Sequence, residues 1–180
     1  MRVILGEYSL RPVKDEDAGL ILEWRNSDRV RKQMLNQEII RWDEHNIWFE
    51  KIKNEEVVLH FIFEYLERPI GFAYITDYNS TEKKCSSGMY LGEVNDVPLD
   101  AGIILRYMQA YYIFEVLRVE NLLDSTKITN RRVLKNNLMG ARIVKNENGI
   151  IWFLKTRDTW SKTEGKLLSG YIDKKIKIIS

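Results

Sequence analysis

The chain contains little cysteine, histidine or proline, and these shortages exclude several kinds of protein. Among its 180 residues there are one cysteine, two histidines and three prolines. Cys85 has no partner for an internal disulfide, and so few Cys and His side chains cannot build a zinc cage. We therefore expect no metal cofactor and a reducing compartment.

An excess of charge of one sign and long apolar runs are also missing. Lys and Arg number 28 against 26 Asp and Glu, which gives a formal net charge of +2. This balance lacks the broad positive field with which nucleic-acid-binding proteins neutralise phosphates. The apolar stretch in MRVILGEYSLRP is shorter than a signal-peptide core or a membrane span. We expect a cytoplasmic protein that binds neither nucleic acid nor membrane.

The composition that is present is globular. Hydrophobic residues make up 44% of the chain and charged residues 30%, and no internal repeat or Pro/Gly/Ser-rich linker interrupts it. A chain of this length buries enough surface for a core of its own, so we expect residues 1–180 to form a single domain.

Hydrophobic periodicity predicts an alternation of helices and strands. The first part reads as a strand over 3–10, a helix over 16–26 capped by Asp15, and a helix opened by Asp43, with Ile47, Trp48 and Ile52 at helical spacing. Antiparallel strands follow at 57–67, 70–78 and 85–93, the first two joined by a turn at Glu67-Arg68-Pro69. The rest reads as a long helix over 101–117, a strand over 119–128, a short helix over 130–140, and a hairpin over 141–156 turned by Asn148-Gly149. This order predicts an α/β (α+β) fold with a mixed, mostly antiparallel twisted sheet, flanking helices and one parallel crossover.

The start of the long helix at Ala101-Gly102 is the first candidate site. A helix start carries unpaired N–H groups and the positive end of the helix dipole, so it suits a pyrophosphate, and glycine allows a close approach. An ordinary strand-to-helix turn explains the same residues.

The series of strand, loop, helix, strand and short helix resembles the acetyl-CoA-binding half of the GNAT superfamily. The resemblance implies that the backbone of Met89, Tyr90, Leu91 and Gly92 binds the pantetheine arm. It also implies that the N–H groups of Leu99, Asp100, Ala101, Gly102 and Ile103 receive the pyrophosphate. The family's loop pattern, Arg/Gln-x-x-Gly-x-Gly/Ala, maps onto Val97 to Gly102 and keeps only Gly102.

Two departures from the family pattern bear on cofactor chemistry. Asp100 stands where the first glycine is usual, and its carboxylate repels a pyrophosphate unless it turns away or caps the helix. In the late motif, Thr129 or Asn130 takes the place of an asparagine, and Asn136 replaces the tyrosine that protonates the leaving thiolate. Asparagine is no general acid, so the thiolate would take its proton from water or another residue.

The first half resembles the acetyltransferases that act on nucleotide-linked 4-amino-sugars in the pseudaminic acid pathway, and it shares part of its pattern with ribosomal-protein N-terminal acetyltransferases. The resemblance extends over about Val3 to Trp152 and leaves residues 160–180 as a C-terminal extension. Its signature is Trp24-Arg25-Asn26, Asn36-Gln37, His45 and Trp48-Phe49.

The residue types in this half suit a sugar nucleotide. Arg25 and Arg31 can contact a diphosphate, Trp24, Trp42 and Trp48 offer stacking faces, and Asn26 and Asn36 can read hydroxyls. Each residue also has a structural explanation, since tryptophans at helical spacing are commonly core residues and arginines are commonly solvated. His45 lies in a first helical turn, which suits a structural role as well as a catalytic one.

Acetyl transfer needs a neutral amine, a path for its proton and donors to the developing oxyanion. Asp77 is the first candidate base, followed by Thr76, Glu93 and His45, and the backbone N–H of Leu91 is the candidate oxyanion donor. A carboxylate at a strand end is also a common turn former.

Three functions remain open. The first is an acetyl-CoA-dependent N-acetyltransferase acting by direct transfer on a nucleotide-linked amino sugar, in surface-glycan or nonulosonic acid synthesis. The second is a peptide or ribosomal-protein N-terminal acetyltransferase, and the third is a non-catalytic GNAT-like binding domain. The basic acceptor side, with Arg25, Arg29, Arg31 and Lys32, favours the anionic sugar nucleotide. The apolar hairpin with Ile150, Trp152 and Leu154 suggests a homodimer, unless the tail from Trp160 covers its edge.

Overall fold

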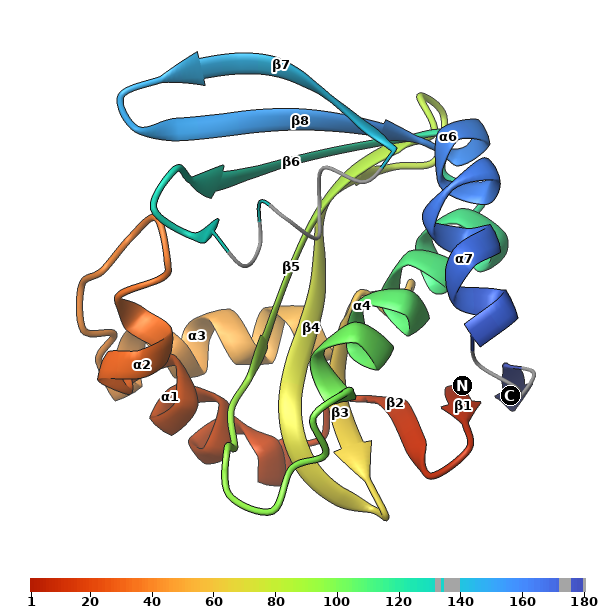
Figure 1. Ribbon diagram of the computed structural model, residues 1–180. Helices are drawn as coiled ribbons and strands as arrows, with labels where there is room; N and C mark the ends of the chain where they lie inside the picture. Colours follow the sequence, from red (N-terminus) through yellow and green to blue (C-terminus); the bar gives the residue numbers. More distant parts are fainter. Residues whose placement is uncertain (132–133, 135–139, 172–175, 180) are drawn as a thin grey trace. The chain divides into compact units, whose positions relative to one another are not determined.

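The computed structural model describes residues 1–131, 134, 140–171 and 176–179. Its strands form a nine-stranded sheet in the hydrogen-bonded order β7-β8-β6-β5-β4-β3-β2-β1-β9 (Figure 1). Of the neighbouring pairs whose register is described, only β5 and β6 are parallel, and these two strands are connected through the long helix; the other described pairs are antiparallel. The predicted α/β class and the parallel crossover are confirmed.

The described chain divides into two compact units. The first comprises Met1–Tyr74, Met89–Met108 and Ile176–Ser180, and the second Ile75–Gly88 and Gln109–Lys175. The chain passes from one to the other within β4 (Arg68–Asn79), β5 (Lys84–Leu91) and α4 (Ala101–Tyr111).

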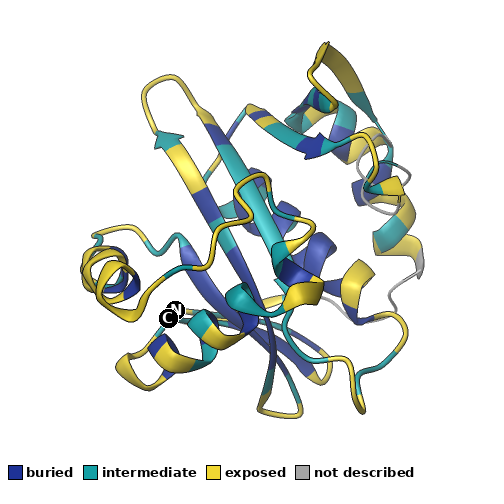
Figure 2. Cartoon of the chain, turned by 90° about the vertical axis from the view of Figure 1, so that its left-hand side faces the viewer, coloured by how far each residue is buried: buried dark blue, intermediate teal, exposed yellow. Residues whose placement is uncertain are grey.

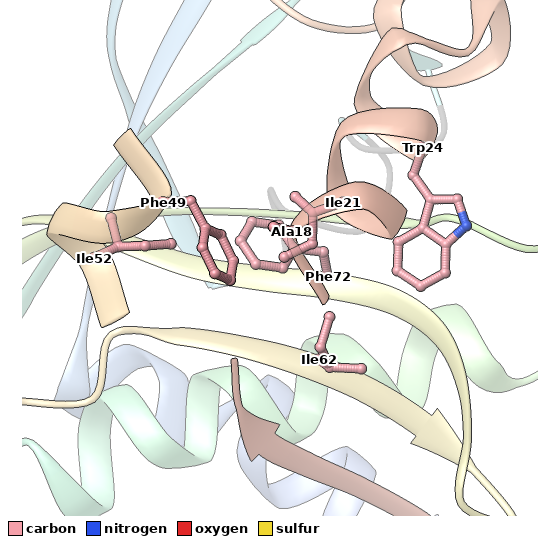
Figure 3. Close-up of a cluster of buried hydrophobic side chains, with 7 residues drawn as sticks. All are labelled: Ala18, Ile21, Trp24, Phe49, Ile52, Ile62 and Phe72. Atoms are coloured by element: carbon pink, nitrogen blue, oxygen red, sulfur yellow. The ribbon is translucent and has the colours of Figure 1, made fainter. Parts of the chain in front are cut away.

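In the first unit, the helices α1 and α3 pack on the sheet through a buried hydrophobic cluster. Phe49 and Ile52 on one helix and Ile21 on the other point toward Ile62 and Phe72 on the strands (Figure 3). Burial of each such side chain stabilises the fold by roughly 1.5–3 kcal/mol. The elements of this unit, besides parts of β4, β5 and α4, are β1 (Arg2–Leu5), β2 (Tyr8–Pro12), η1 (Asp15–Asp17), α1 (Ala18–Asn26), α2 (Asp28–Arg31), α3 (Trp42–Lys53), β3 (His60–Tyr65) and β9 (Lys177–Ile179).

The predicted first strand over 3–10 is wrong, because residues 2–12 form a hairpin. Gly6 has a φ of +63° and reverses the chain between β1 and β2, with Val3 opposite Leu10. Similarly, the turn between β3 and β4 lies at Leu66-Glu67, whose φ values are +49° and +63°, so that Arg68 and Pro69 already belong to β4.

Neither predicted aspartate caps its helix. Asp15 begins a short 3-10 turn, and Asp17 instead accepts the Lys14 N–H at 2.7 Å and two hydrogen bonds from Arg11. Asp43 lies inside the first turn of α3, whose N-cap is Arg41.

The buried side of α3 also differs from the predicted spacing. His45, Phe49 and Ile52 are buried, whereas Ile47 is 75% exposed and Trp48 is 36% exposed. Sequence periodicity missed this because a histidine occupies a core position. It also missed the short helix α2.

The second unit contains a long hairpin and two terminal helices. β7 (Ala141–Glu147) and β8 (Ile150–Thr156) turn at Asn148-Gly149, both with positive φ, as predicted. β8 pairs with β6 (Asn121–Lys127), and the three strands are drawn side by side in Figure 1. The remaining elements are the π-helix η2 (Tyr112–Val116), which continues the long helix, α6 (Arg157–Lys162) and α7 (Glu164–Tyr171).

A second core lies beneath these helices. The rings of Phe114 and Trp160 stack at 5.3 Å between centroids, and Lys155 forms an ion pair with Glu164, both side chains being almost completely buried. Buried residues concentrate in the central strands and in α4 and η2, whereas the loops and the strand β7 are mostly exposed (Figure 2).

Two predictions concern the end of the chain. The helix expected over 130–140 falls mostly outside the described residues, although the N–H of Leu134 donates to Asn130 O. The tail does not end on the closing hairpin, because β9 pairs antiparallel with β1.

Candidate functional site

The start of α4 lies in the first unit and is accessible. A Cβ built on Gly102 would find its nearest neighbour, Leu91 Cδ1, at 3.9 Å, and Leu99 and Ile103 are exposed on either side. The carbonyl of Asp100 accepts the N–H groups of Ile103 and Ile104. In the described part of the chain no acceptor is found for the N–H of Gly102.

The Asp100 carboxylate is held by a residue from the other end of the sequence. Its Oδ1 accepts a 2.6 Å hydrogen bond from the Tyr8 hydroxyl on β2. The side chain therefore does not cap α4. Sequence reasoning named Asp100 as a problem for phosphate binding but had no signal for this partner.

The loop that leads to α4, residues 92–100, is fixed at several further points. Both Gly92 N and Glu93 N donate to the carbonyl of Ile70 on β4. Arg29 donates to Gly92 O, and Arg68 Nη2 donates to Asn95 O at 3.2 Å and Asp96 O at 2.7 Å. These contacts give the loop a defined backbone before any ligand binds.

Trp24 anchors the same loop from α1. Its indole is 3% exposed, and a Cβ on Gly92 would lie 2.0 Å from its Cδ2. Its Nε1 donates a 2.8 Å hydrogen bond to Glu93 Oε1. The structure therefore places Trp24 in the core against Gly92 and gives Glu93 an intramolecular donor.

In the second unit, the parallel strands β5 and β6 are paired over two residues each and then separate. Lys84 and Cys85 pair with Asn121 and Leu122, and the pairing stops there. Beyond this point side chains bond to the β5 backbone instead. Asp124 Oδ1 and Oδ2 accept from Ser87 N at 2.6 Å and Ser87 Oγ at 2.9 Å.

On the next residue of β5, Gln109 Nε2 donates to Gly88 O at 2.9 Å. Met89 to Gly92, whose backbone the resemblance assigns to the pantetheine arm, follow directly after Gly88 in the chain. Asp124 and Gln109 were not identified from the sequence, because the register that places them opposite β5 is set by tertiary pairing.

The residues predicted to bind the acceptor hold the segment between α2 and α3, residues 32–41. Asn26 exchanges hydrogen bonds with both backbone groups of Ile40, at 2.8 and 2.9 Å. Arg25 Nη2 donates to Asn36 O at 2.7 Å, and Arg31 Nη1 donates to Gln37 O at 3.0 Å. The structure thus brings Arg25, Asn26, Arg31, Asn36 and Gln37 together.

The two arginines differ in how their charge is balanced. Arg31 pairs with Asp28, whose pKa is lowered by Lys32 and by Arg31 itself. Arg25 has no carboxylate partner in the part of the chain that the structure describes, and its buried Nη1 has no acceptor there. Burial raises the pKa of Tyr90 on β5, Tyr74 adds to that rise, and the charge of Arg25 opposes it.

An aromatic group extends along α3 and the neighbouring strands. The ring of Trp48 lies 5.2 Å from His45, 5.8 Å from His60 and 6.3 Å from Phe72. His45 Nε2 lies 2.8 Å from Ala18 O, so this nitrogen carries the proton, and burial lowers the pKa of His45. His60 is also buried, and desolvation lowers its pKa to about 4.

The predicted base candidates Thr76 and Asp77 lie on β4 in the second unit. Both are exposed, and Asp77 has a φ of +52°. Thr129 and Asn130 follow β6, and Asn136 lies outside the described residues. Of the described residues, no three His, Cys, Asp or Glu side chains are grouped to hold a metal ion. A search of the same residues finds no helix that is long and apolar enough to cross a bilayer.

Comparison with known proteins identifies the fold. No protein-family model and no curated protein matches the sequence. Among solved structures, the chain is similar to FdhC, a nucleotide-linked sugar GNAT, with a TM-score of 0.78 at 20% identity over 96% of this chain and 98% of that one.

Two further structures are similar over most of their length. Spermidine N-acetyltransferase from Vibrio cholerae, in complex with CoA and spermine, gives a TM-score of 0.75 at 12% identity over 86% and 98% of the two chains. The N-acetyltransferase PseH from Campylobacter jejuni gives 0.63 at 18% identity over 83% and 98%. This chain therefore has the fold that these GNAT acetyltransferases share.

Proposed function

We propose that the protein is an acetyl-CoA-dependent N-acetyltransferase that transfers the acetyl group directly to an amine on a nucleotide-linked amino sugar. The fold is that of GNAT acetyltransferases, one of them a nucleotide-linked sugar GNAT. The separation of β5 from β6 and the accessible start of α4 support binding of the donor.

Acetyl-CoA fits the residues that the resemblance assigns to it. The N–H groups at the start of α4 suit a pyrophosphate, and Gly102 leaves room for it. The donor residues we propose are Met89, Tyr90, Leu91, Gly92, Leu99, Asp100, Ala101, Gly102 and Ile103, with Thr129, Asn130 and Asn136 beyond β6. When bound, acetyl-CoA supplies the acetyl group as a thioester.

Arg25 is the observation that carries the choice of acceptor. A half-buried guanidinium that lacks a carboxylate partner, and that keeps a buried N–H without an acceptor, favours an anionic ligand. A diphosphate supplies both the charge and the missing acceptor. Arg31, Asn36, Gln37 and the half-exposed Trp48 complete the acceptor residues we propose. The buried Trp24 and His45 and the half-buried Asn26 position them.

The base that we propose is Asp77, acting directly or through a water, with Thr76 beside it. His45 is a weaker candidate because its Nε2–H is bonded to Ala18 O and its pKa is lowered by burial. Glu93 already accepts from the Trp24 indole. The amine loses its proton to the base as the C–N bond forms and the C–S bond breaks, while the Leu91 N–H stabilises the oxyanion. The departing thiolate takes a proton from water.

A peptide N-terminal acetyltransferase is the second candidate, favoured by nothing specific in the described acceptor residues. A basic peptide would place its positive charge beside Arg25, which costs binding energy. A non-catalytic binding domain is the third candidate and predicts no turnover with any amine.

Calorimetric titration with acetyl-CoA, followed by a CoA-release assay, separates these functions. We expect binding, and release with a UDP-4-amino-sugar but not with a basic peptide. Arg25→Gln should raise KM for the sugar nucleotide about tenfold or more and leave KM for acetyl-CoA unchanged. Arg142→Gln on the exposed face of β7 is the matched control. Absence of acetyl-CoA binding would refute both enzymatic functions, and release with the peptide alone would refute the sugar acceptor.

A further inference from the structure

The loop 92–100 departs from the GNAT pattern at Val97 and Asp100. For each departure the structure contains a contact that can compensate for it. Val97 removes the arginine or glutamine that begins the pattern, and Asp100 adds a carboxylate next to the start of α4. Both changes weaken the attraction of the loop for an anion.

Tyr8 binds the carboxylate that Asp100 adds to the loop. Its hydroxyl donates to Asp100 Oδ1 at 2.6 Å, and its ring is 8% exposed and fixed between two others. It stacks on Phe63 at 5.4 Å with an interplanar angle of 3°, and it contacts Tyr65 at 5.0 Å. A donor held so firmly on β2 keeps the carboxylate in one direction.

The Tyr8 hydroxyl also stays protonated. Burial raises its pKa, and the hydrogen bond and charge of Asp100 raise it further, as do Tyr65 and Glu7. The hydroxyl is therefore a neutral hydrogen-bond donor to Asp100. The carboxylate is not bonded to the first turn of α4, because Ile103 and Ile104 donate to the Asp100 backbone carbonyl instead.

Arg68 brings a positive charge to the part of the loop where Val97 replaces the arginine or glutamine of the family pattern. Its Nη2 donates to the carbonyls of Asn95 and Asp96, the residues immediately before Val97. The side chain is exposed and has no acidic partner in the described ranges of the chain. A guanidinium charge from β4 therefore lies beside the residues that precede Val97, the position at which the family pattern has arginine or glutamine.

We propose that Tyr8 and Arg68 restore diphosphate binding to this loop, Tyr8 by holding the Asp100 carboxylate away from the start of α4 and Arg68 by supplying the charge that Val97 lacks. This inference rests on the proposed function, since it takes the diphosphate of acetyl-CoA as the ligand. Tyr8 is a positioning residue that acts through Asp100, and Arg68 binds the anion directly.

A double-mutant cycle with CoA as the titrant tests the role of Tyr8. Tyr8→Phe should raise Kd for CoA about fivefold, because the freed Asp100 carboxylate would repel the diphosphate, and a repulsion between exposed charges is of this size. Asp100→Asn should bind CoA at least as tightly as the wild type. Tyr8→Phe with Asp100→Asn should bind like Asp100→Asn alone, because no carboxylate is left to hold. If the double variant binds as weakly as Tyr8→Phe, Tyr8 acts through packing and the proposal is overturned.

Arg68 is tested with Arg68→Gln against the control Arg142→Gln. We expect a rise in Kd of about fivefold that shrinks as salt is added, whereas the control should bind like the wild type. Equal binding by Arg68→Gln and the wild type overturns the role of Arg68. A wild type that binds no CoA overturns the proposed function itself, whereas a wild type that binds beside an unaffected Tyr8→Phe overturns only this inference.

Discussion

Gly92 is the position at which one added methyl group should cost most. It directly follows β5, and a Cβ there would lie 2.0, 2.2 and 2.4 Å from Cδ2, Cε2 and Cγ of the buried Trp24 indole. These distances are far below van der Waals contact, so the indole, the loop or both must move. The backbone of Gly92 is not in the left-handed region, and steric overlap alone therefore carries the effect.

The expected cost of Gly92→Ala is at the upper end for overpacking of a core, about 3 kcal/mol. For a chain of this length, that corresponds to a fall in Tm of roughly 6–12 °C. The shift should also break the hydrogen bond from Trp24 to Glu93. Thermal denaturation followed by circular dichroism measures the first effect, and tryptophan fluorescence reports the second.

Gly19→Ala is the matched control for this prediction. Gly19 lies exposed within α1 and has no heavy atom within 4 Å of its added Cβ. Because alanine is the better helix former, this variant should gain about 0.5–1 kcal/mol. Gly92→Ala combined with Trp24→Leu should cost less than the sum of the single changes, since the two residues are in contact. Equal Tm values for Gly92→Ala and Gly19→Ala would show that the indole does not occupy this position.

Three further predictions concern burial, pH and backbone conformation. Lys155→Met should cost about 3–5 kcal/mol by removing the cation that pairs with the buried Glu164 carboxylate, and Lys155→Met with Glu164→Leu should recover most of that in chemical denaturation; equal stability of the single and double variants would contradict this. His60, with a folded pKa of about 4 against an ordinary 6.5, contributes stability that is complete above pH 6.5 and is lost as the pH falls to about 4. The loss should reach roughly 3 kcal/mol and be absent from His60→Phe, so parallel pH profiles for the two proteins would refute the assignment. Gly149→Ala should cost about 1 kcal/mol through its φ of +74° alone, because nothing lies within 4 Å of the added methyl; a neutral result in urea denaturation would argue against the turn conformation.

Much of the fold could be predicted because local pattern and tertiary structure agree. The stripe of Ile104, Leu105 and Met108 on α4 is buried, and Asn148-Gly149 turns the closing hairpin. The first hairpin was missed for a physical reason. Gly6 sits inside an apolar run, and periodicity alone cannot tell whether a glycine there continues the strand or reverses it.

The candidate site was harder to predict because side chains have more than one possible partner. Residue type singled out Arg25, Asn26, Arg31 and Asn36 as candidate acceptor-binding residues, and that role stays a prediction. It could not show that most of their hydrogen bonds go to the backbone of residues 36–40, since that depends on how the segment between α2 and α3 folds back. Tyr8 and Asp124 gave no signal at all, because each reaches its partner across a long stretch of sequence.

The distribution of these contacts bears on how an acceptor would be bound. These side chains donate to and accept from the backbone of the segment between α2 and α3. The segment is therefore ordered before a ligand arrives, and binding loses no further conformational entropy there. What remains unsatisfied then marks where the ligand must contribute. Within the described acceptor residues, this leftover capacity is the buried Nη1 of Arg25 and the buried Nε of Arg31, two guanidinium groups that bond to consecutive carbonyls. An acceptor with a negative charge between them satisfies both and also balances the charge of Arg25, whereas a basic peptide offers neutral carbonyls and adds positive charge.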